Sequence, residues 1–314
     1  MSIVVPCYNE SEVFSYCLNT LTLLMEKLIA SSILSSDSKI IFVDDGSKDN
    51  TWELISLACQ NSNMINGVKL SRNKGHQIAL MAGLSVVDTD ISISIDADLQ
   101  DDIECIPQMI EQYKNGFDIV YGVRNDRSSD STFKRSTANI FYKLMTKLGV
   151  EQVENHADFR LLSQRALTAL LKYQEQNLYI RGIIPQLGYR STKVYYSRSE
   201  RLAGESKYPI KKMLSLALDG VTSLSITPLR LVTFLGFGIS LISFIMILYS
   251  LGSYFIGETV SGWASIIIVL SFLGGIQMLC LGVIGEYIGK IYLESKKRPK
   301  FFIEEVIDHA RNDV

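Results

Sequence analysis

The 314-residue chain has few of the residues that build disulfide frameworks and soft metal sites. It has five widely spaced cysteines without a CxxC pair, and three histidines. This usage predicts buried or incidental thiols in a reducing compartment, not a disulfide framework or a metal cluster. An excess of charge is also absent, since 31 basic and 33 acidic residues leave a net charge of −2. A broad basic face for nucleic acid is therefore not expected.

Two long segments lack charged residues altogether. Residues 231–257 and 259–285 contain no Asp, Glu, Lys, Arg or His, and Glu258 alone separates them. With a rise of about 1.5 Å per residue, a helix over either segment would reach about 40 Å, whereas the hydrocarbon core of a bilayer is about 30 Å thick. We therefore predict two transmembrane helices within residues 230–290. Their lack of charge argues against an ion or proton path through this chain alone.

Basic residues flank the predicted spans on one side of the membrane. They are Lys211, Lys212 and Arg230 before the first span, and Lys290, Lys296, Lys297, Arg298 and Lys300 after the second. The positive-inside rule then places the N-terminal domain and a tail at 291–314 in the cytoplasm, which predicts a multi-pass protein of the cytoplasmic (inner) membrane. Apolar residues at helical spacing in 208–229 predict an amphipathic helix on the membrane surface, with a core helix of the domain as the alternative.

Residues 1–207 alternate short β-rich runs with segments of helical periodicity. We predict strands at 2–5, 39–43, 66–70, 91–95 and 118–121, and helices at 12–30, 50–59, 78–87 and 106–114. This alternation predicts an α/β domain with a mostly parallel sheet that helices cover on both faces. Such sheets bind ligands at the carboxyl ends of their strands, and the polar clusters of this sequence fall there.

The cluster after the fourth predicted strand is Asp96-Ala97-Asp98-Leu99-Gln100. If the extended geometry continues past the strand, Asp96, Asp98 and Gln100 project to one side. Two carboxylates and an amide oxygen suit Mg²⁺ or Mn²⁺ shared with substrate phosphates. Acidic pairs at strand ends are also common in solvated loops, so this cluster alone does not define a metal site.

The second predicted strand ends in Val43-Asp44-Asp45-Gly46-Ser47. A carboxylate here can accept hydrogen bonds from a base N–H or a ribose hydroxyl. The alternative is a turn between strand and helix, with Gly46 at positive φ and Ser47 or Asp49 as a helix cap. That alternative leaves the two adjacent acids unexplained.

Three further clusters can carry chemistry. In Pro6-Cys7-Tyr8-Asn9-Glu10, Tyr8 can lie against a nucleobase and Glu10 can hydrogen-bond to it. A diphosphate and an anionic acceptor carry more charge than one divalent ion neutralises, so cations are expected nearby. The candidates are Arg124, Lys134, Arg135, Arg201 and Lys207. In Asn155–Arg160, Asp158 is either a catalytic base or a structural acid paired with an arginine. We interpret the histidines, His76, His156 and His309, as incidental or structural.

Taken in order, seven strings resemble the inverting family 2 glycosyltransferases of the GT-A fold. The resemblance is closest to the bactoprenol (polyprenyl-phosphate) glucosyltransferases and extends to the dolichol-phosphate mannose synthases. The strings are Val5–Glu10, Val43–Asp49, Ser71–Gly75, Asp96–Gln100, Asp158–Leu161, Arg201–Lys207 and Gly285–Tyr292. They span nearly the whole chain. The pair Asp101-Asp102, two further acids directly after Gln100, departs from the pattern.

The resemblance implies a role for each matching position. It implies contacts to the donor nucleotide at Pro6, Tyr8, Glu10, Val43, Asp45, Asp96 and Ala97. It implies phosphate contacts at Arg124, Arg201 and Lys207. Asp98 and Gln100, beside Asp96, match metal ligands, and Asp158 matches a catalytic acid. The implied reaction moves a hexose, foremost glucose from UDP-glucose, onto undecaprenyl phosphate with inversion. The acceptor is a phosphate monoester with a second pKa of about 6, so it is already ionised at neutral pH. A catalytic base that removes a proton from it would therefore accelerate the reaction little. We therefore predict that Asp158 positions the acceptor or an arginine.

Several alternatives stay open at the level of sequence. The donor sugar can instead be GlcNAc, GalNAc, galactose or mannose. A processive polysaccharide synthase is disfavoured because Trp52 and Trp263 do not supply the Gln-x-x-Arg-Trp string of such enzymes. A non-catalytic nucleotide-binding scaffold or flippase subunit is the alternative from another class. Homo-oligomer formation and a separate flippase for the product are further expectations.

Overall fold

A mixed sheet forms the centre of the computed structural model, which describes residues 1–125, 156–176, 178–197, 225–256 and 262–308. The strand order is β7-β5-β6-β4-β1-β2-β3-β8. The strands are β1 Ser2–Cys7, β2 Lys39–Asp44, β3 Ile65–Leu70, β4 Ile91–Ser94, β5 Ile119–Arg124, β6 His156–Ser163, β7 Ser191–Tyr196 and β8 Ile303–Ile307. Strands β1 to β4 are parallel, as are β5 and β7, whereas β6 is antiparallel to both of its neighbours. The predicted α/β fold with a mostly parallel sheet is confirmed.

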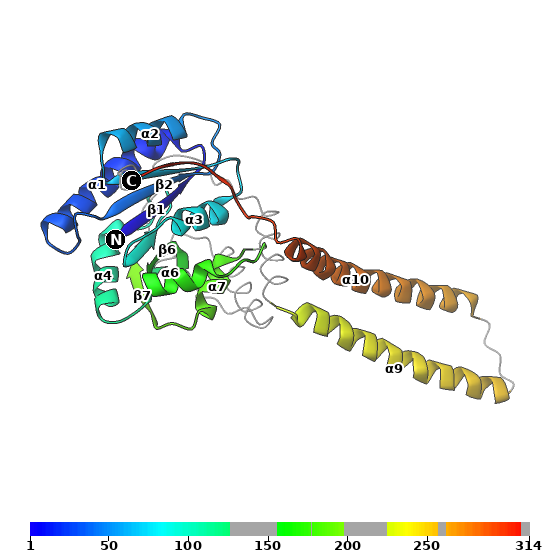
Figure 1. Cartoon of the computed structure of the whole chain (residues 1–314). Helices are drawn as coiled ribbons and strands as arrows, with labels where there is room; N and C mark the ends of the chain where they lie inside the picture. Colours follow the sequence, from blue (N-terminus) through cyan, green and yellow to red (C-terminus); the bar gives the residue numbers. More distant parts are fainter. Residues whose placement is uncertain (126–155, 177, 198–224, 257–261, 309–314) are drawn as a thin grey trace.

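Helices cover both faces of the sheet (Figure 1). One face carries α1 Ser11–Ala30, α2 Thr51–Asn61 and α4 Ile106–Lys114, with the short helix η1 Ile103–Cys105 before α4; the other carries α3 His76–Ser85, α6 Gln164–Leu171 and α7 Ile180–Gln186. Each face has its own core cluster. Phe14, Ile55 and Met109 belong to the first, and Leu80, Leu167 and Ile183 to the second. Both clusters are anchored by alternate residues of the same strands, as expected for a sheet buried on both faces.

Two long helices, α9 Thr227–Ile256 and α10 Trp263–Ser295, extend from one side of the domain (Figure 1). Both are long and apolar enough to cross a membrane, and none of their apolar windows is buried inside the protein. Large side chains such as Phe237, 71% exposed, have no protein cover, which indicates association with a membrane. Helix α1 also passes the length and composition criterion, but Phe14 and Leu21 bury it against the sheet. Residues 208–224 of the predicted surface helix at 208–229 lie outside the described residues.

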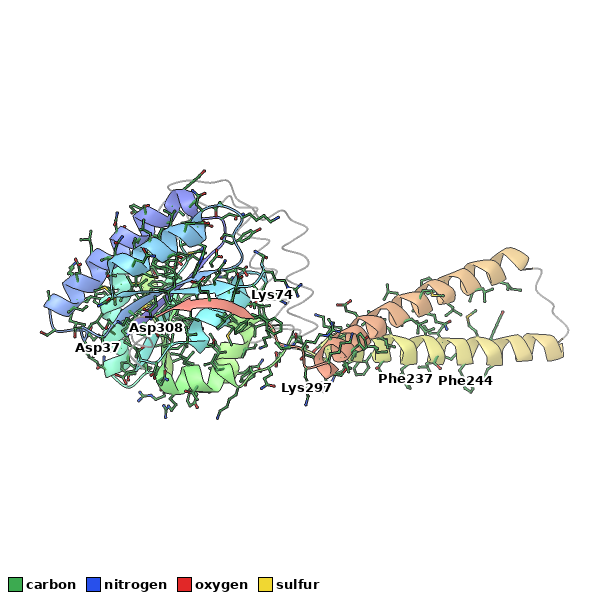
Figure 2. The ribbon with its side chains drawn as sticks, turned by 45° about the horizontal axis from the view of Figure 1, so that its top comes forward. Asp37, Lys74, Phe237, Phe244, Lys297 and Asp308 are labelled. Carbon is green, nitrogen blue, oxygen red and sulfur yellow. The ribbon has the colours of Figure 1, made fainter. Side chains whose placement is uncertain are left out.

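The segment after α10 returns to the domain, where we had expected only a tail. Strand β8 pairs antiparallel with the outer side of β3 and becomes an edge of the sheet (Figure 2). Lys69 and Glu304 form an ion pair of 3.3 Å across this junction. Ile303 packs against the second core cluster and Ile307 against the first. The domain is therefore joined to the apolar helices both before α9 and after α10.

All five cysteines are free, and Cys7, Cys17, Cys59 and Cys105 are buried in the domain. Burial raises the pKa of Cys17 and of Cys59 to about 12. These thiols stay protonated at neutral pH and act as small apolar side chains. The predicted burial is confirmed for these four thiols.

Candidate active site

The predicted site residues that the structure describes lie along the side of the sheet where β1 to β4 end. The chain runs from β1 outward to β3 and then returns to β4 on the other side of β1, so the strand order reverses between β1 and β4. Ligands bind at such reversals. Because β6 runs antiparallel to β4, the amino end of β6, which carries Asp158, lies at this same edge. In Figure 2 Lys74, which follows β3, lies on the side from which α9 and α10 extend, and Asp37, which precedes β2, lies on the opposite side.

The two adjacent acids after β2 fix the surrounding loops. Asp44 accepts hydrogen bonds of 3.2 and 3.3 Å from the backbone N–H of Ser47. Asp45, 2% exposed, accepts 2.7 Å and 2.8 Å hydrogen bonds from the backbone N–H groups of Lys74 and Gly75. Burial raises the pKa of Asp45, and these hydrogen bonds oppose the shift. Asp45 thus ties the loop after β2 to the loop that leads into α3.

Gly46 allows these two loops to approach each other. Its φ of +65° is the predicted positive value. A Cβ at this position would lie 2.6 Å from the backbone nitrogen of Asn73. Only glycine meets both requirements. Asp49, one of the two predicted caps, accepts a hydrogen bond from the backbone N–H of Thr51 in the first turn of α2. It also accepts one from the backbone N–H of Ser11 at the start of α1.

The predicted donor contacts at β1 and β2 differ in exposure. Tyr8 is 37% exposed, and Glu10 is partly exposed beside it. Val43 is completely buried in the second core cluster, Ala97 is 6% exposed, and Pro6 is buried within β1. Tyr8 and Glu10 therefore present surface to a ligand, whereas the other three side chains form the supporting layer beneath. Their roles toward a donor stay predictions.

The segment Asp96–Gln100 after β4 forms a turn. The extended geometry that would have projected Asp96, Asp98 and Gln100 to one side does not continue past the strand. Leu99 donates its backbone N–H to the carbonyl of Asp96 at 3.2 Å and has a φ of +44°. Gln100 is 3% exposed, and its backbone N–H lies 3.4 Å from Oδ1 of Asp98. Oδ1 of Asp96 lies 3.3 Å from Nε2 of His76. The three predicted metal ligands therefore share a tight turn, not one face of a strand.

The oxygen atoms of Asp96, Asp98 and Gln100 fit a divalent ion that is held mainly by a bound diphosphate. Among the described residues, no group of three His, Cys, Asp or Glu side chains is placed to hold a metal by itself. Burial raises the pKa of Asp96 to about 6, and neighbouring acids add to this effect whereas His76 opposes it. An ion shared with substrate phosphates needs only one or two carboxylates, and it would relieve this repulsion. The ligand roles of Asp96, Asp98 and Gln100 stay predictions.

Asp158 is the centre of an ion-pair network in the strand β6. It pairs with Arg160, which is 1% exposed, and with Arg181 of α7 through two hydrogen bonds of 3.2 and 3.1 Å. Burial opposes ionisation of Asp158, but the neighbouring cationic groups of Arg181, His76 and Arg160 together hold its pKa well below the usual range. Of the two interpretations of Asp158, the arginine-paired acid is the one that this geometry supports.

His76, which the sequence analysis interprets as incidental or structural, lies within this ion-pair network. Its Nε2 lies 3.3 Å from Asp96 and 3.4 Å from Asp158, so it bridges the acids of β4 and β6. Burial lowers the pKa of His76, yet the nearby carboxylates of Asp158 and Asp96 outweigh it and raise the pKa to about 9. The sequence offered one signal for His76, because it directly follows the string Ser71–Gly75, which comes after the end of β3. Arg181 has no comparable signal in the sequence.

The two extra acids after Gln100 have structural partners. Arg124, at the end of β5, donates to Asp101 at 2.8 and 3.2 Å, and Tyr196 of β7 donates to Asp101 at 2.5 Å. Asp102 accepts from the backbone N–H of Glu104 at the start of η1. Arg124 therefore reaches the site edge already paired. Lys134, Arg135, Arg201 and Lys207, the other predicted cations, lie outside the described residues.

Comparisons with known proteins define the class. Residues 2–177, more than half of the chain, match the family model "Glycosyl transferase family 2". The chain belongs to glycosyl transferase family 2 and is a glycosyltransferase.

Two curated relatives match the chain over nearly its whole length. The first, "Uncharacterized glycosyltransferase YkoT" of Bacillus subtilis (strain 168), is 49% identical over 306 residues, covering 97% of this chain and 91% of that one. The second, "Bactoprenol glucosyl transferase" of Shigella phage SfV, is 40% identical over 309 residues, covering 97% and 98%. Among solved structures, glucosyl-3-phosphoglycerate synthase from Mycobacterium tuberculosis, in complex with Mn²⁺, UDP and glucosyl-3-phosphoglycerate, is 17% identical with a TM-score of 0.46, covering 71% of this chain and 77% of that one. That similarity is too low to transfer a ligand.

Proposed function

We propose that the protein transfers glucose from UDP-glucose to undecaprenyl phosphate with inversion, at the cytoplasmic face of the inner membrane. The product is a lipid-phosphate-linked glucose for modification of cell-envelope glycans. The bactoprenol glucosyl transferase relative, similar over 97% of this chain, supports both the sugar and the acceptor. The observation that carries the proposal is the meeting of Tyr8, Asp96–Gln100 and Asp158 at the sheet edge on the side of the two apolar helices.

Helices α9 and α10 form a transmembrane hairpin in this proposal. The chain enters α9 from the domain and, after α10, adds β8 to the same sheet. A chain that leaves the domain and returns to it across a bilayer must cross an even number of times, which supports two spans. The isoprenoid tail of the acceptor stays in the bilayer, so the hairpin keeps the site at the level of the lipid headgroups.

The donor lies across the ends of β1, β2 and β4. Tyr8 stacks on the uracil, Glu10 hydrogen-bonds to it, and Asp45 holds the neighbouring loop in place. Asp98 and Gln100, with Asp96 beside them, would hold Mg²⁺ or Mn²⁺ against the diphosphate. The ion, when bound, neutralises charge on the diphosphate leaving group. Further phosphate contacts fall on Arg124, Arg201 and Lys207.

The acceptor phosphate approaches from the side of Asp158 and Arg181. Asp158 is a poor base because three cationic groups favour its ionised form, and the acceptor phosphate has no proton that must be removed. Arg181, 37% exposed at its side chain, uses Nε and Nη2 on Asp158 and keeps other N–H groups for a second anion. Asp158 thus orients Arg181 toward the phosphate.

The bond changes balance without an external base. A phosphate oxygen of the acceptor attacks C1 of the glucose, and the bond from C1 to the UDP oxygen breaks. The electron pair of that bond leaves with UDP, so no proton is transferred. A single in-line displacement inverts the anomeric carbon and gives a β-linked lipid phosphosugar.

The test uses the purified full-length chain in vesicles that contain undecaprenyl phosphate. UDP-glucose, UDP-GlcNAc, UDP-GalNAc, UDP-galactose and GDP-mannose are supplied separately, and lipid-linked sugars are identified by mass spectrometry with and without EDTA. We expect metal-dependent transfer, fastest from UDP-glucose. Fastest transfer from another donor would contradict the assignment of glucose. Nucleotide binding without any transfer would favour the non-catalytic scaffold.

A further inference from the structure

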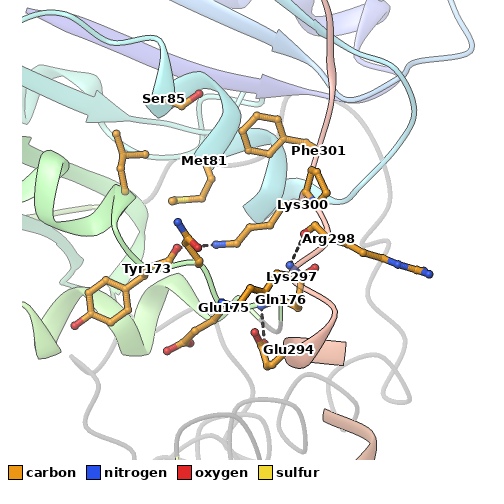
Figure 3. Close-up of a pocket in the computed structure, with 13 residues that line it drawn as sticks. Met81, Ser85, Tyr173, Glu175, Gln176, Glu294, Lys297, Arg298, Lys300 and Phe301 are labelled. Carbon is orange, nitrogen blue, oxygen red and sulfur yellow. Dashed lines mark hydrogen bonds between the residues drawn. The ribbon is translucent and has the colours of Figure 1, made fainter. Parts of the chain in front are cut away.

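The end of α10 contacts the loop between α6 and α7 (Figure 3). A cavity of about 650 Å³ lies at this junction, lined by residues of α3, of the loop and of the segment that leads from α10 to β8. None of the predicted site residues is among its described lining. The contacts that close it connect the apolar helix to a segment that enters the active site.

Three hydrogen bonds cross the junction. The backbone N–H of Gln176 donates to Oε1 of Glu294 at 2.6 Å, and its side-chain Nε2 donates to the carbonyl of Arg298 at 2.6 Å. Lys300 donates from Nζ to the carbonyl of Tyr173 at 2.8 Å. We call this set the α10 clasp. It fixes the loop from Tyr173 to Gln176 against the last turn of α10 and the residues after it.

The clasp is partly removed from solvent, which strengthens its polar contacts. Burial lowers the pKa of Lys300, against the opposing charges of Glu175 and Glu294. Burial also raises the pKa of Glu175, and Glu294 adds to that shift. Hydrogen bonds that involve charged groups are stronger than neutral ones, and a buried partner left without its bond carries a desolvation cost.

The other end of the loop enters α7, which carries Arg181. The backbone N–H of Ile180 donates to Oε1 of Gln77 at 2.9 Å, directly beside His76. Ile180 and Ile183 of α7 are buried in the second core cluster, against which Phe301 of the segment after α10 also packs. Helix α7, which carries Arg181, and Phe301, which follows the clasp residue Lys300, therefore pack into the same core cluster.

We propose that Glu294 is a positioning residue for sugar transfer: through Gln176 it holds α7 so that Arg181 meets Asp158 in the orientation that receives the acceptor phosphate. This role rests on the proposed function of Arg181. Glu294 does not touch the substrate. It couples the placement of the helix α10 in the bilayer to the geometry of the acceptor side of the site.

The test compares Glu294→Ala, Glu294→Gln and the matched control Glu305→Ala in the full-length chain in vesicles. The glutamine keeps an oxygen that can accept from Gln176, and Glu305 is an exposed carboxylate of β8 on the same C-terminal segment. The measurements are kcat and KM for undecaprenyl phosphate with UDP-glucose, the Kd for UDP, and backbone amide exchange of residues 180–186 without substrate.

We expect Glu294→Ala to lower kcat/KM for the acceptor by about tenfold or more, because small misplacements of a positioning group cost this much. Its Kd for UDP should stay unchanged and exchange in 180–186 should rise, while Glu294→Gln and Glu305→Ala resemble the wild type. Unchanged acceptor kinetics in Glu294→Ala would overturn the proposal. A loss of UDP binding in parallel with activity would also overturn it, because Glu294 would then act on stability alone. The exchange measurement needs no substrate, so it reports on the clasp even if the wild type proves inactive on this substrate pair.

Discussion

Replacing Asp158 by asparagine tests the ion-pair network more sharply than any other single change. The substitution keeps the size of the side chain and removes its charge. Arg160, whose side chain is 1% exposed, then lacks its carboxylate, and Arg181 loses the partner of its two hydrogen bonds. We expect both stability and activity to fall, for separate reasons.

The expected loss of stability follows from the burial of Arg160. Removing one partner of a buried ion pair costs about 3–5 kcal/mol, and the remaining amide oxygen of asparagine places this case near the lower end. For a domain of this size about 3 kcal/mol lowers Tm by roughly 6–12 °C. The fluorescence of Trp52, which lies in α2 of the domain, can follow the transition.

The double variant Asp158→Asn with Arg160→Met separates the two effects. It removes the uncompensated buried charge, so we expect most of the lost stability to return. Transfer to undecaprenyl phosphate should stay low, by about 10²-fold or more, because Arg181 is no longer oriented. An Asp158→Asn protein with unchanged Tm and turnover within about threefold of wild type would refute this reasoning.

Three further outcomes follow from the structure. Gly46→Ala should weaken UDP binding and lower Tm, because the added Cβ would lie 2.6 Å from the backbone nitrogen of Asn73. The control Gly188→Ala, also at positive φ but with open space around it, should change only Tm. Equal affinities for UDP in the two variants would contradict the role of the loop contact at Gly46. Deleting residues 303–314 should lower Tm and promote aggregation by exposing the edge of β3, and a truncated chain as stable as wild type would show that β8 is dispensable. EDTA should stop transfer and added Mn²⁺ or Mg²⁺ should restore it; full activity in EDTA would contradict the roles of Asp98 and Gln100.

Periodicity was sufficient to predict β1 to β5 and α1 to α4, whereas β6, α6, α7 and β7 were not predicted. The predicted helix at 106–114 coincides with α4, and β1, β2 and β3 extend the predicted strands by one or two residues. Such elements carry their signal locally because their own apolar spacing determines which face is buried. Strand β8 was missed for the opposite reason. Its partner β3 lies more than 200 residues earlier, and three of its residues are exposed.

The candidate site was predictable where it follows strand ends and unpredictable where it depends on packing. Tyr8 and Asp98 were found because the carboxyl ends of parallel strands converge. The roles of His76 and Arg181 depend on how α3 and α7 pack beside β6, and no local pattern encodes that contact. Asp101 was visible as an unexplained acid, but its partner Arg124 could be identified only in the folded sheet.

We propose that a nucleotide sugar binds across the ends of β1 and β4, between Tyr8 and the turn Asp96–Gln100, beside the bilayer. The most direct measurement is a crystal structure of the full-length chain with UDP-glucose and Mn²⁺, with the ion located by its anomalous scattering. We expect the manganese peak at Asp98, with the uracil on Tyr8 and the glucose toward Arg181. A peak elsewhere, or a nucleotide seated in the cavity beside α10, would contradict it.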